Sequence, residues 1–145
     1  MKEIHDVLNN ALVLIFNLVL KSEEKFIRNL GVNLSIAEIH TIDAIAKVEK
    51  KTMSEVASNL SITLGTLTAS INNLEKKGYV ERNRSQVDRR VVLVNITQRG
   101  EDVVEQHRAF HKEMIKDIVA NLNTREELAL VKALDNLIDY FMSKK

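Results

Sequence analysis

Several residue types are missing or scarce in this chain of 145 residues, and each absence excludes a class of structure or chemistry. The sequence has no cysteine, no proline, no tryptophan and only four glycines, and aromatic residues make up 4% of it. Without cysteine the fold cannot depend on disulfides, and the chain has no thiolate nucleophile. With so few glycines it also has no glycine-rich phosphate loop and no nucleophile elbow. We therefore expect that the protein is not an enzyme.

Long apolar runs are scarce as well. The longest, residues 11–20 (ALVLIFNLVL), is interrupted by Asn17 and is shorter than the roughly 20 residues that a membrane span needs. The charges at Lys2, Glu3 and Asp6 have mixed signs, which is not typical of a signal peptide. Hydrophobic residues at 45% and charged residues at 28% are typical of a soluble domain with a sizeable core. We expect a cytoplasmic protein with no membrane partner.

The sequence does contain clear helix signals. A Ser or Thr followed three residues later by Glu lets each side chain bond the free backbone N–H of the other residue at a helix start. This pattern occurs at Ser35 with Glu38, at Thr52 with Glu55 and at Thr124 with Glu127. Together with the apolar periodicity, it predicts helices over residues 4–29, 36–47, 53–59, 64–77, 98–122 and 125–142.

The segments between these helices contain turn and strand signals. Gly31 and Gly78 are expected to end the first and fourth helices, because glycine takes a left-handed conformation without strain. Residues 79–85 and 90–96 are typical of two strands joined by a turn at residues 86–89. The sequence therefore predicts a mainly α protein with a β-hairpin wing, in which the two short helices before the hairpin form a helix-turn-helix.

The fourth predicted helix has one apolar face and one polar face. Leu67, Ile71 and Leu74 share the apolar face, which is expected to pack into the core. The other face carries hydroxyl, amide and small side chains, which allow close approach to a DNA groove and can bond base edges. Gly65 costs helix stability in the first turn, which suggests a surface that comes very near it. The residues of this helix predicted to contact DNA are Thr63, Gly65, Thr66, Ala69, Asn72, Asn73 and Lys76.

The predicted hairpin concentrates positive charge. Residues 60–100 contain seven Lys and Arg against three Asp and Glu, whereas the rest of the chain is net negative. An arginine at a turn tip can enter a narrow minor groove, and one nearer a strand can reach phosphates. Asp88 is expected to pair with an arginine and fix its direction. The wing residues predicted to bind DNA are Arg82, Arg84, Asp88, Arg89 and Arg90.

These motifs resemble the MarR family of winged helix-turn-helix transcription regulators, and the resemblance covers nearly the whole chain. The family's wing pattern Asp-x-Arg matches residues 88–90, and the segments LEKKGYVERNRS and LVNITQRG match its flanks. By this resemblance, residues 65–73 would read the major groove and Arg90 the minor groove of a palindromic operator in double-stranded DNA.

The resemblance also implies how the chain is organised. It implies a single MarR-type domain over residues 1–145, with a DNA-binding lobe at residues 35–97. Residues 1–34 and 98–145 would supply helices that join a homodimer. The apolar stripes of the first and last predicted helices are the material for that surface.

More narrowly, the segments IHTIDAI, TLGTLTASINNLEKKGY, RSQVDRRVV and HRAFHKEM resemble the bacterial repressors of fatty-acid synthesis genes within the family. That subgroup uses long-chain acyl groups on acyl carrier protein as co-repressor. The candidates for lining an acyl channel are Phe16, Phe26, Ile27, Leu30, Ile39, Phe110 and Met114. The candidates for docking the acidic carrier protein are Lys21, Lys25 and Arg28.

Two alternatives to the acyl effector remain open. His107 and His111 are four residues apart on one predicted helix face, and His40 with Glu24 could complete a tetrahedral zinc site. Some relatives in the MarR family respond to zinc through a similar pair, so a zinc-responsive regulator is the first alternative. A regulator of small aromatic ligands is the second. No cofactor is expected otherwise.

Overall fold

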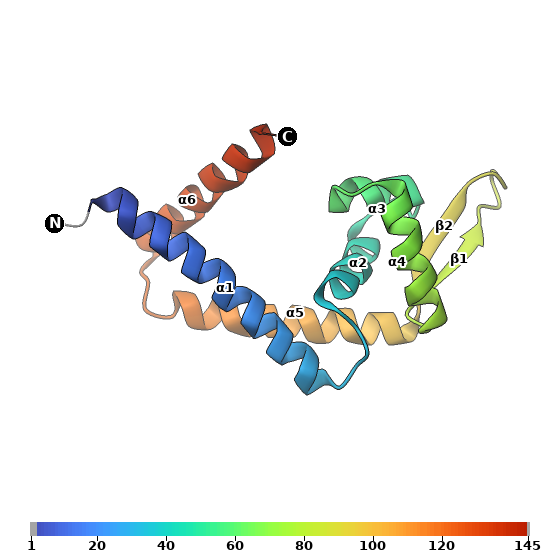
Figure 1. Ribbon diagram of the computed structural model, residues 1–145, viewed down its shortest axis with the longest axis horizontal. Helices are drawn as coiled ribbons and strands as arrows, with labels where there is room; N and C mark the ends of the chain where they lie inside the picture. The colour runs from blue at the N-terminus through green and yellow to red at the C-terminus, as the bar shows by residue number, and fades with distance from the viewer. Residues whose placement is uncertain (1–2, 145) are drawn as a thin grey trace. The chain divides into compact units, whose positions relative to one another are not determined.

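The computed structural model describes residues 3–144 and forms two compact units, Met1–Gln106 and His107–Lys145. The helices of the described residues are α1 (Ile4–Leu30), α2 (Ile36–Lys47), α3 (Met53–Leu60), α4 (Leu64–Lys76), α5 (Gln98–Val119) and α6 (Thr124–Ser143), and the strands are β1 (Val80–Arg84) and β2 (Val92–Ile96). In the first unit the hairpin extends from the group formed by α2, α3 and α4 (Figure 1). The predicted fold class, mainly α with a β-hairpin wing, is confirmed.

Side-chain caps explain why α2 and α3 begin where they do. Ser35 Oγ accepts a hydrogen bond from the Glu38 N–H at 3.1 Å, and Glu38 Oε2 accepts one from the Ser35 N–H at 3.3 Å. Thr52 Oγ1 accepts from the Glu55 N–H at 3.2 Å. Each cap satisfies a backbone donor that the helix itself cannot, which is worth about 1 kcal/mol. Both predicted starts are confirmed.

The start of α6 differs from the prediction by one residue. The Asn123 side chain accepts hydrogen bonds from the N–H groups of Arg125 and Glu126, and the Glu126 carboxylate accepts one from the Asn123 N–H. The predicted pairing of Thr124 with Glu127 is therefore wrong. Neighbouring residues both belong to cap-forming types, and asparagine caps a helix at least as well as threonine.

Left-handed backbone conformations mark the ends of α1, α3 and α4. Gly31 has φ 69° and Gly78 has φ 83°, as predicted for residues that end helices. The C-cap of α4 is Lys77, so Gly78 is the residue just beyond it. Ser61, with φ 55°, closes α3 and starts the tight turn into α4. This turn completes the predicted helix-turn-helix.

The hairpin pairs antiparallel along both strands and is attached to the helices by a third segment. Its loop spans residues 85–91, which is longer than the predicted turn. The Val94 N–H donates to the Lys51 carbonyl at 2.7 Å, and Thr52 forms a bridge with Leu93. Because a two-stranded hairpin is at best marginally stable alone, this pairing with the chain before α3 helps to fix the base of the wing.

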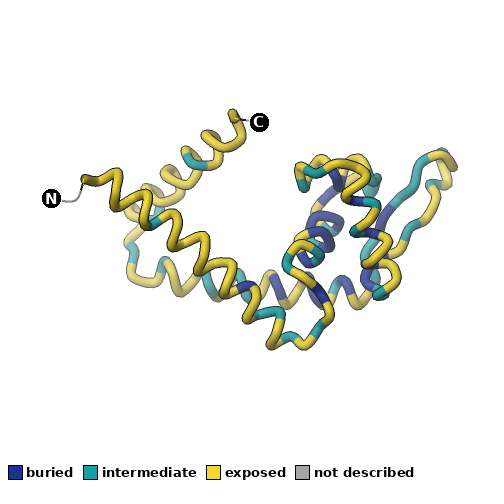
Figure 2. The backbone as a smooth tube through the Cα atoms, viewed as in Figure 1, coloured by how far each residue is buried: buried dark blue, intermediate teal, exposed yellow. Residues whose placement is uncertain are grey.

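The core of the first unit lies between α2, α3, α4 and the hairpin (Figure 2). Leu67, Ile71 and Leu74 are each 0% exposed, which confirms the predicted apolar face of α4. The largest fully buried side chains are Ile39, Ile42, Ile45, Val56, Leu67, Ile71, Leu74, Val80, Val94 and Val104.

The first turn of α5 is held tightly against the segment that follows α4. Thr97 Oγ1 donates to the Gly78 carbonyl at 2.6 Å, and the Thr97 N–H donates to the Tyr79 carbonyl at 3.0 Å. The Arg99 guanidinium lies 4.5 Å from the centre of the Tyr79 ring. A Cβ on Gly100 would lie 2.4 Å from the Tyr79 carbonyl oxygen, so only glycine fits there. These contacts fix the C-terminal end of α4 to the start of α5.

Two helices, α1 and α6, carry apolar faces that the single chain leaves exposed (Figure 2). Among the described residues, Glu23 is the buried residue of α1, and α6 has none. The exposed apolar side chains of α1 are Ile4, Val7, Leu8, Leu12, Val13, Leu14, Ile15, Phe16, Leu18, Val19 and Leu20. Those of α6 are Leu128, Leu130, Val131, Leu134, Ile138, Tyr140, Phe141 and Met142.

The length and hydropathy of α1 also meet the criteria for a membrane span. It is the helix in the described part of the chain that does so, with a mean hydropathy of 1.3 over an 18-residue window. A helix whose apolar face packs against another protein chain meets the same criteria. The exposed apolar face of α1 is therefore expected to be covered by another molecule.

Candidate DNA interface

The N-terminus of α4 is capped and exposed to solvent. Thr63 Oγ1 accepts a hydrogen bond from the Thr66 N–H at 3.2 Å and donates to Thr66 Oγ1 at 2.9 Å, which confirms the predicted cap. All residues of this helix that the sequence predicted to contact DNA are exposed, and they follow the face opposite Leu67, Ile71 and Leu74. They are Thr63, Gly65, Thr66, Ala69, Asn72, Asn73 and Lys76.

The surroundings of Gly65 are open. A Cβ built on this residue meets nothing within 4 Å, so no contact inside the chain requires a glycine there. The backbone in this turn can therefore be approached closely from outside. The hydroxyl and amide groups around it can donate and accept hydrogen bonds, as a reader of base edges needs.

Hydrogen bonds order the tip of the wing. Ser85 Oγ accepts from the N–H groups of Val87 and Asp88, and the Ser85 N–H donates to the Val91 carbonyl at 2.9 Å. Asp88 accepts three bonds from Arg90, from its backbone N–H, Nε and Nη2, each at 3.1 Å. The predicted pairing of Asp88 with an arginine is confirmed, and its partner is Arg90.

The Asp88–Arg90 pair orients an arginine without burying it. The Arg90 side chain is 90% exposed, so its second edge remains open to a ligand. The hydrogen bonds from Arg90 hold the pKa of the Asp88 carboxyl below its ordinary value, because they favour its charged form. A guanidinium held in one direction loses less entropy on binding than a free one.

The other wing arginines fall into two groups. Arg84 and Arg89 are exposed, and Arg84 Nη1 donates to the Arg89 carbonyl at 2.8 Å. Arg82 instead points back to α4, where its Nη2 lies 3.0 Å from Glu75 Oε1. Arg82 is thus engaged within the chain, which the sequence alone did not indicate.

A groove of about 510 Å³ lies between the wing and the N-terminal ends of α3 and α4. Helix N-termini present free N–H groups and partial positive charge, and the Arg90 guanidinium, although paired with Asp88, is 90% exposed at the groove. This combination attracts an anion such as a backbone phosphate. The residues that line the groove are Thr52, Met53, Ser54, Leu64, Thr68, Arg82, Arg90, Val91 and Val92.

The candidate effector residues differ widely in exposure. Phe16 is 65% exposed, whereas Ile39 is 1% exposed and belongs to the core. Ile27 and Leu30 are half-buried and pack against that core. Phe26, Phe110 and Met114 are half-buried too. The candidate docking residues Lys21, Lys25 and Arg28 are all exposed on α1.

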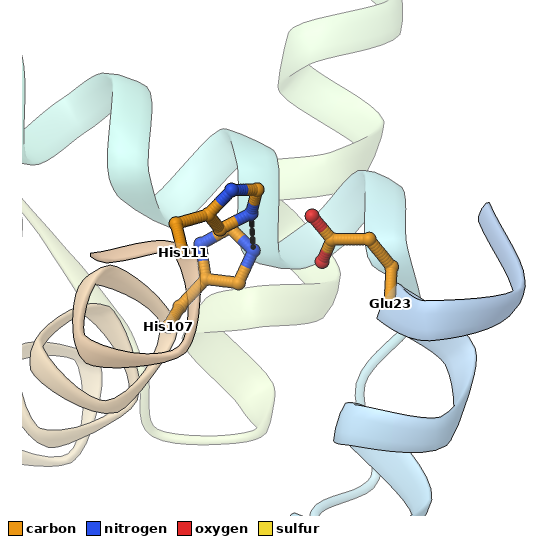
Figure 3. A group of neighbouring side chains, drawn as sticks. All are labelled: Glu23, His107 and His111. Atoms are coloured by element: carbon orange, nitrogen blue, oxygen red, sulfur yellow. Dashed lines mark hydrogen bonds between the residues drawn. The ribbon is translucent and has the colours of Figure 1, made fainter. Parts of the chain in front are cut away.

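The structure brings together two of the residues in the alternative zinc set. His107 Nε2 and His111 Nε2 are 3.1 Å apart on α5, and a hydrogen bond joins the two rings (Figure 3). The Phe110 ring lies edge-on to His111, with 5.4 Å between their centres. Glu24 and His40 are both exposed on their own helices, and it is the neighbouring Glu23 that is buried on α1.

One residue of the site was missing from the sequence prediction. Glu75 accepts bonds from Arg82 and so belongs to the interface as the partner of a wing residue. A signal existed in the sequence, because an acid in the last turn of a helix opposes the helix dipole and needs a compensating cation.

Comparison with known proteins gives the site its context. A family model described as transcriptional regulator SarA/Rot matches residues 25–107. Streptococcus pneumoniae FabT, whose crystal structure is a complex with DNA, superposes with a TM-score of 0.87 at 40% identity over 97% of this chain and 99% of that one. Escherichia coli MarR, a multiple antibiotic resistance protein, is 27% identical over 139 residues, 92% of this chain and 96% of its own.

A further relative is the HTH-type transcriptional regulator YdgJ of Bacillus subtilis. It is 26% identical over 110 residues, which is 76% of this chain and 66% of that relative's length. Together with the winged helix-turn-helix described above, these matches show that the chain belongs to the MarR family of winged-helix transcription regulators. It is a DNA-binding regulator, and the prediction that it is not an enzyme is confirmed by the nature of its relatives.

Proposed function

We propose that this protein is a cytoplasmic, homodimeric repressor that binds a palindromic operator and controls fatty-acid synthesis genes. One observation carries the DNA-binding part: the exposed polar face of α4 and the arginine-tipped wing belong to the same unit, with a groove between them. α4 would read base edges in the major groove, and Arg90 would enter the minor groove. Residues 35–97 would then act as the DNA-binding lobe.

The exposed apolar faces of α1 and α6 support a dimer. Monomeric soluble proteins rarely expose contiguous apolar surface on this scale, and a second copy of the chain would cover it. A helix-turn-helix reads one half-site, so a two-fold dimer matches the two halves of a palindrome. Residues 1–34 and 98–145 would supply the dimer helices.

Two observations support the fatty-acid role. The sequence segments quoted above resemble fatty-acid-synthesis repressors, and the chain matches FabT over nearly its whole length at 40% identity. Long-chain acyl groups on acyl carrier protein would act as co-repressor. They would be bound by the apolar candidates named above, which are Phe16, Phe26, Ile27, Leu30, Ile39, Phe110 and Met114. The exposed stripe of Lys21, Lys25 and Arg28 would dock the acidic carrier.

The test is operator affinity measured by fluorescence anisotropy against a chain-length series of acyl carrier proteins. An acyl chain changes operator affinity only by the extra affinity that the DNA-binding state has for that chain, and operator DNA strengthens acyl binding by the same factor. Each added methylene that is buried only in the DNA-binding state should contribute up to about 0.8 kcal/mol until the channel is full. Affinity for the operator should therefore rise with chain length and then level off, while the carrier without an acyl chain has no effect.

Two variants separate the channel from the docking stripe. Phe26→Ala should reduce the response to long chains, and Arg28→Glu should reduce the response to all acyl carriers. Lys116→Glu replaces an exposed cation on α5 by the same acid and serves as the control. Equal responses to short, long and absent acyl chains would reject the acyl effector and favour a small aromatic ligand.

A zinc-responsive regulator is the second candidate, and the His107–His111 pair favours it. Two imidazole nitrogens 3.1 Å apart on adjacent helix turns can approach one metal ion after small rotamer changes. Elemental analysis of the purified protein and operator affinity with and without added Zn²⁺ would decide between the candidates. Stoichiometric zinc that changes operator affinity, and is lost in His107→Ala, would support the zinc candidate.

A further inference from the structure

Arg82 differs from the other arginines of the wing in what it contacts. Its backbone N–H and Nε donate to Glu75 Oε2 at 3.1 and 3.4 Å, and its Nη2 donates to Oε1 at 3.0 Å. One residue of β1 therefore engages both oxygens of one carboxylate on α4. The Arg82 and Glu75 side chains are 30% and 39% exposed, whereas that of Arg90 is 90% exposed.

The position of Glu75 adds to this difference. It lies in the last turn of α4, where the helix dipole disfavours a negative charge. The hydrogen bonds from Arg82 offset that cost and hold the pKa of the Glu75 carboxyl below its ordinary value. The pair thus forms a charged, two-pronged link between the recognition helix and the wing, with a fixed geometry that a single lysine could not provide.

The link lies near the base of the wing, since Arg82 is opposite Val94, the residue that also pairs with Lys51. It adds a side-chain contact with α4 to that attachment. Beyond this level the hairpin is a two-stranded ribbon with an exposed tip, where Val87 is 99% exposed. A groove lined by Leu64 and Thr68 of α4 and by Arg82 and Arg90 of the wing lies between the two elements. The angle between α4 and the hairpin decides whether the tip can reach a minor groove while α4 lies in the adjacent major groove.

We propose that the Glu75–Arg82 pair sets the angle between α4 and the wing, so that Arg82 acts in DNA recognition as a positioning residue and not as a phosphate contact. The proposal rests on the DNA-binding function proposed above. It changes the predicted role of Arg82 and leaves those of Arg84, Arg89 and Arg90 as they were. It also makes Glu75, an acid that DNA should repel, a residue on which operator binding depends.

The two possible roles of Arg82 predict opposite effects of Glu75→Gln on operator affinity. If Arg82 is a phosphate contact, Glu75→Gln removes an anion near DNA and releases a cation toward it, so binding becomes tighter. If the pair positions the wing, the same substitution loosens the hairpin and binding becomes weaker. Glu75→Gln keeps the size of the side chain and lies at the surface, so the protein is expected to stay folded, which thermal unfolding checks.

The experiment measures affinity over a series of salt concentrations. The probe is a duplex of about 30 base pairs selected by the wild-type protein from a random library. Glu75→Gln and Arg82→Ala should each weaken binding about tenfold with an unchanged salt slope. Arg84→Ala is the control, and it should lower the slope by about one per protomer, because an arginine on a phosphate releases a counterion.

A double variant that exchanges the two charges tests whether operator binding can be restored. Glu75→Arg combined with Arg82→Glu restores the ion pair with the same net charge, so it should bind more tightly than either single variant. Tighter binding by Glu75→Gln, or a salt slope lowered by Arg82→Ala as much as by Arg84→Ala, would overturn the positioning role. If the wild-type protein selects no duplex at all, the proposed function itself fails, and the role of Arg82 fails with it.

Discussion

Gly65 and Gly100 both lie in the first turn of a helix, and their surroundings impose opposite demands. A Cβ on Gly100 would meet the Tyr79 carbonyl oxygen at 2.4 Å and the Ile96 Cβ at 3.1 Å. A Cβ on Gly65 would meet nothing within 4 Å. Neighbouring atoms of the chain require glycine at position 100, whereas any requirement for glycine at position 65 must come from a partner.

The two glycines give a matched pair of substitutions. Gly65→Ala should raise the free energy of unfolding by up to about 1 kcal/mol, because alanine favours a helix, and should weaken operator binding if DNA approaches this turn. Gly100→Ala should lower the unfolding temperature, because its methyl group collides with fixed backbone. Thermal unfolding and fluorescence anisotropy check both. Unchanged operator affinity in Gly65→Ala would show that DNA does not come close there.

The charge of Glu75 is expected to depend on Arg82 in a way that NMR can follow. The pKa of the Glu75 carboxyl is lowered from 4.5, chiefly by the side-chain hydrogen bond from Arg82. The stability that this pair contributes is therefore fully present above the ordinary pKa and is lost as the pH falls through the lowered one. Titration of the Glu75 side-chain carbon signal should show a midpoint below 4.5, and Arg82→Ala should move it upward. An unchanged midpoint in Arg82→Ala would contradict the pairing in solution.

At the scale of elements, the sequence predicted most of what local interactions decide. The start of α2 matches because Ser35 and Glu38 complete their own capping box within four residues. The start of α6 was missed by one residue because Asn123 and Thr124 compete for the same role. The partner of Arg82 could not be predicted with the same ease. All wing arginines look alike in sequence, and the contact with Glu75 depends on how the hairpin folds back on α4.

The competing caps of α6 can be tested directly. Asn123→Ala removes an acceptor for the N–H groups of Arg125 and Glu126 and should lower the free energy of unfolding by about 1 kcal/mol. Thr124→Ala alters the next residue in the chain, inside the helix, and should change stability by less than about 0.5 kcal/mol. Urea unfolding measures both. A larger loss from Thr124→Ala would restore the capping box that the sequence predicted.

At the scale of the whole molecule, α1 and α6 expose apolar surface that another molecule is expected to cover. Hydrophobic burial is the main favourable term in association, and these helices expose Leu, Ile, Val and Phe side chains along their length. A membrane or a second copy of the chain could cover α1. The wing and the exposed face of α4 favour the second copy, because a palindromic DNA site requires two half-site readers.

A matched pair of substitutions on α6 tests the dimer. Leu134 is 48% exposed on the apolar face, and Leu134→Glu would bury a charge in a dimer surface. Asn136→Glu adds the same charge to the polar side of the same helix. In sedimentation experiments Leu134→Glu should shift the protein toward a monomer of 16.5 kDa, while Asn136→Glu should keep the mass of the dimer. The monomer should also bind the operator with about half the salt slope, because one half-site supplies half the phosphate contacts. A Leu134→Glu protein that stays dimeric and binds with the wild-type slope would place the dimer surface elsewhere than α6.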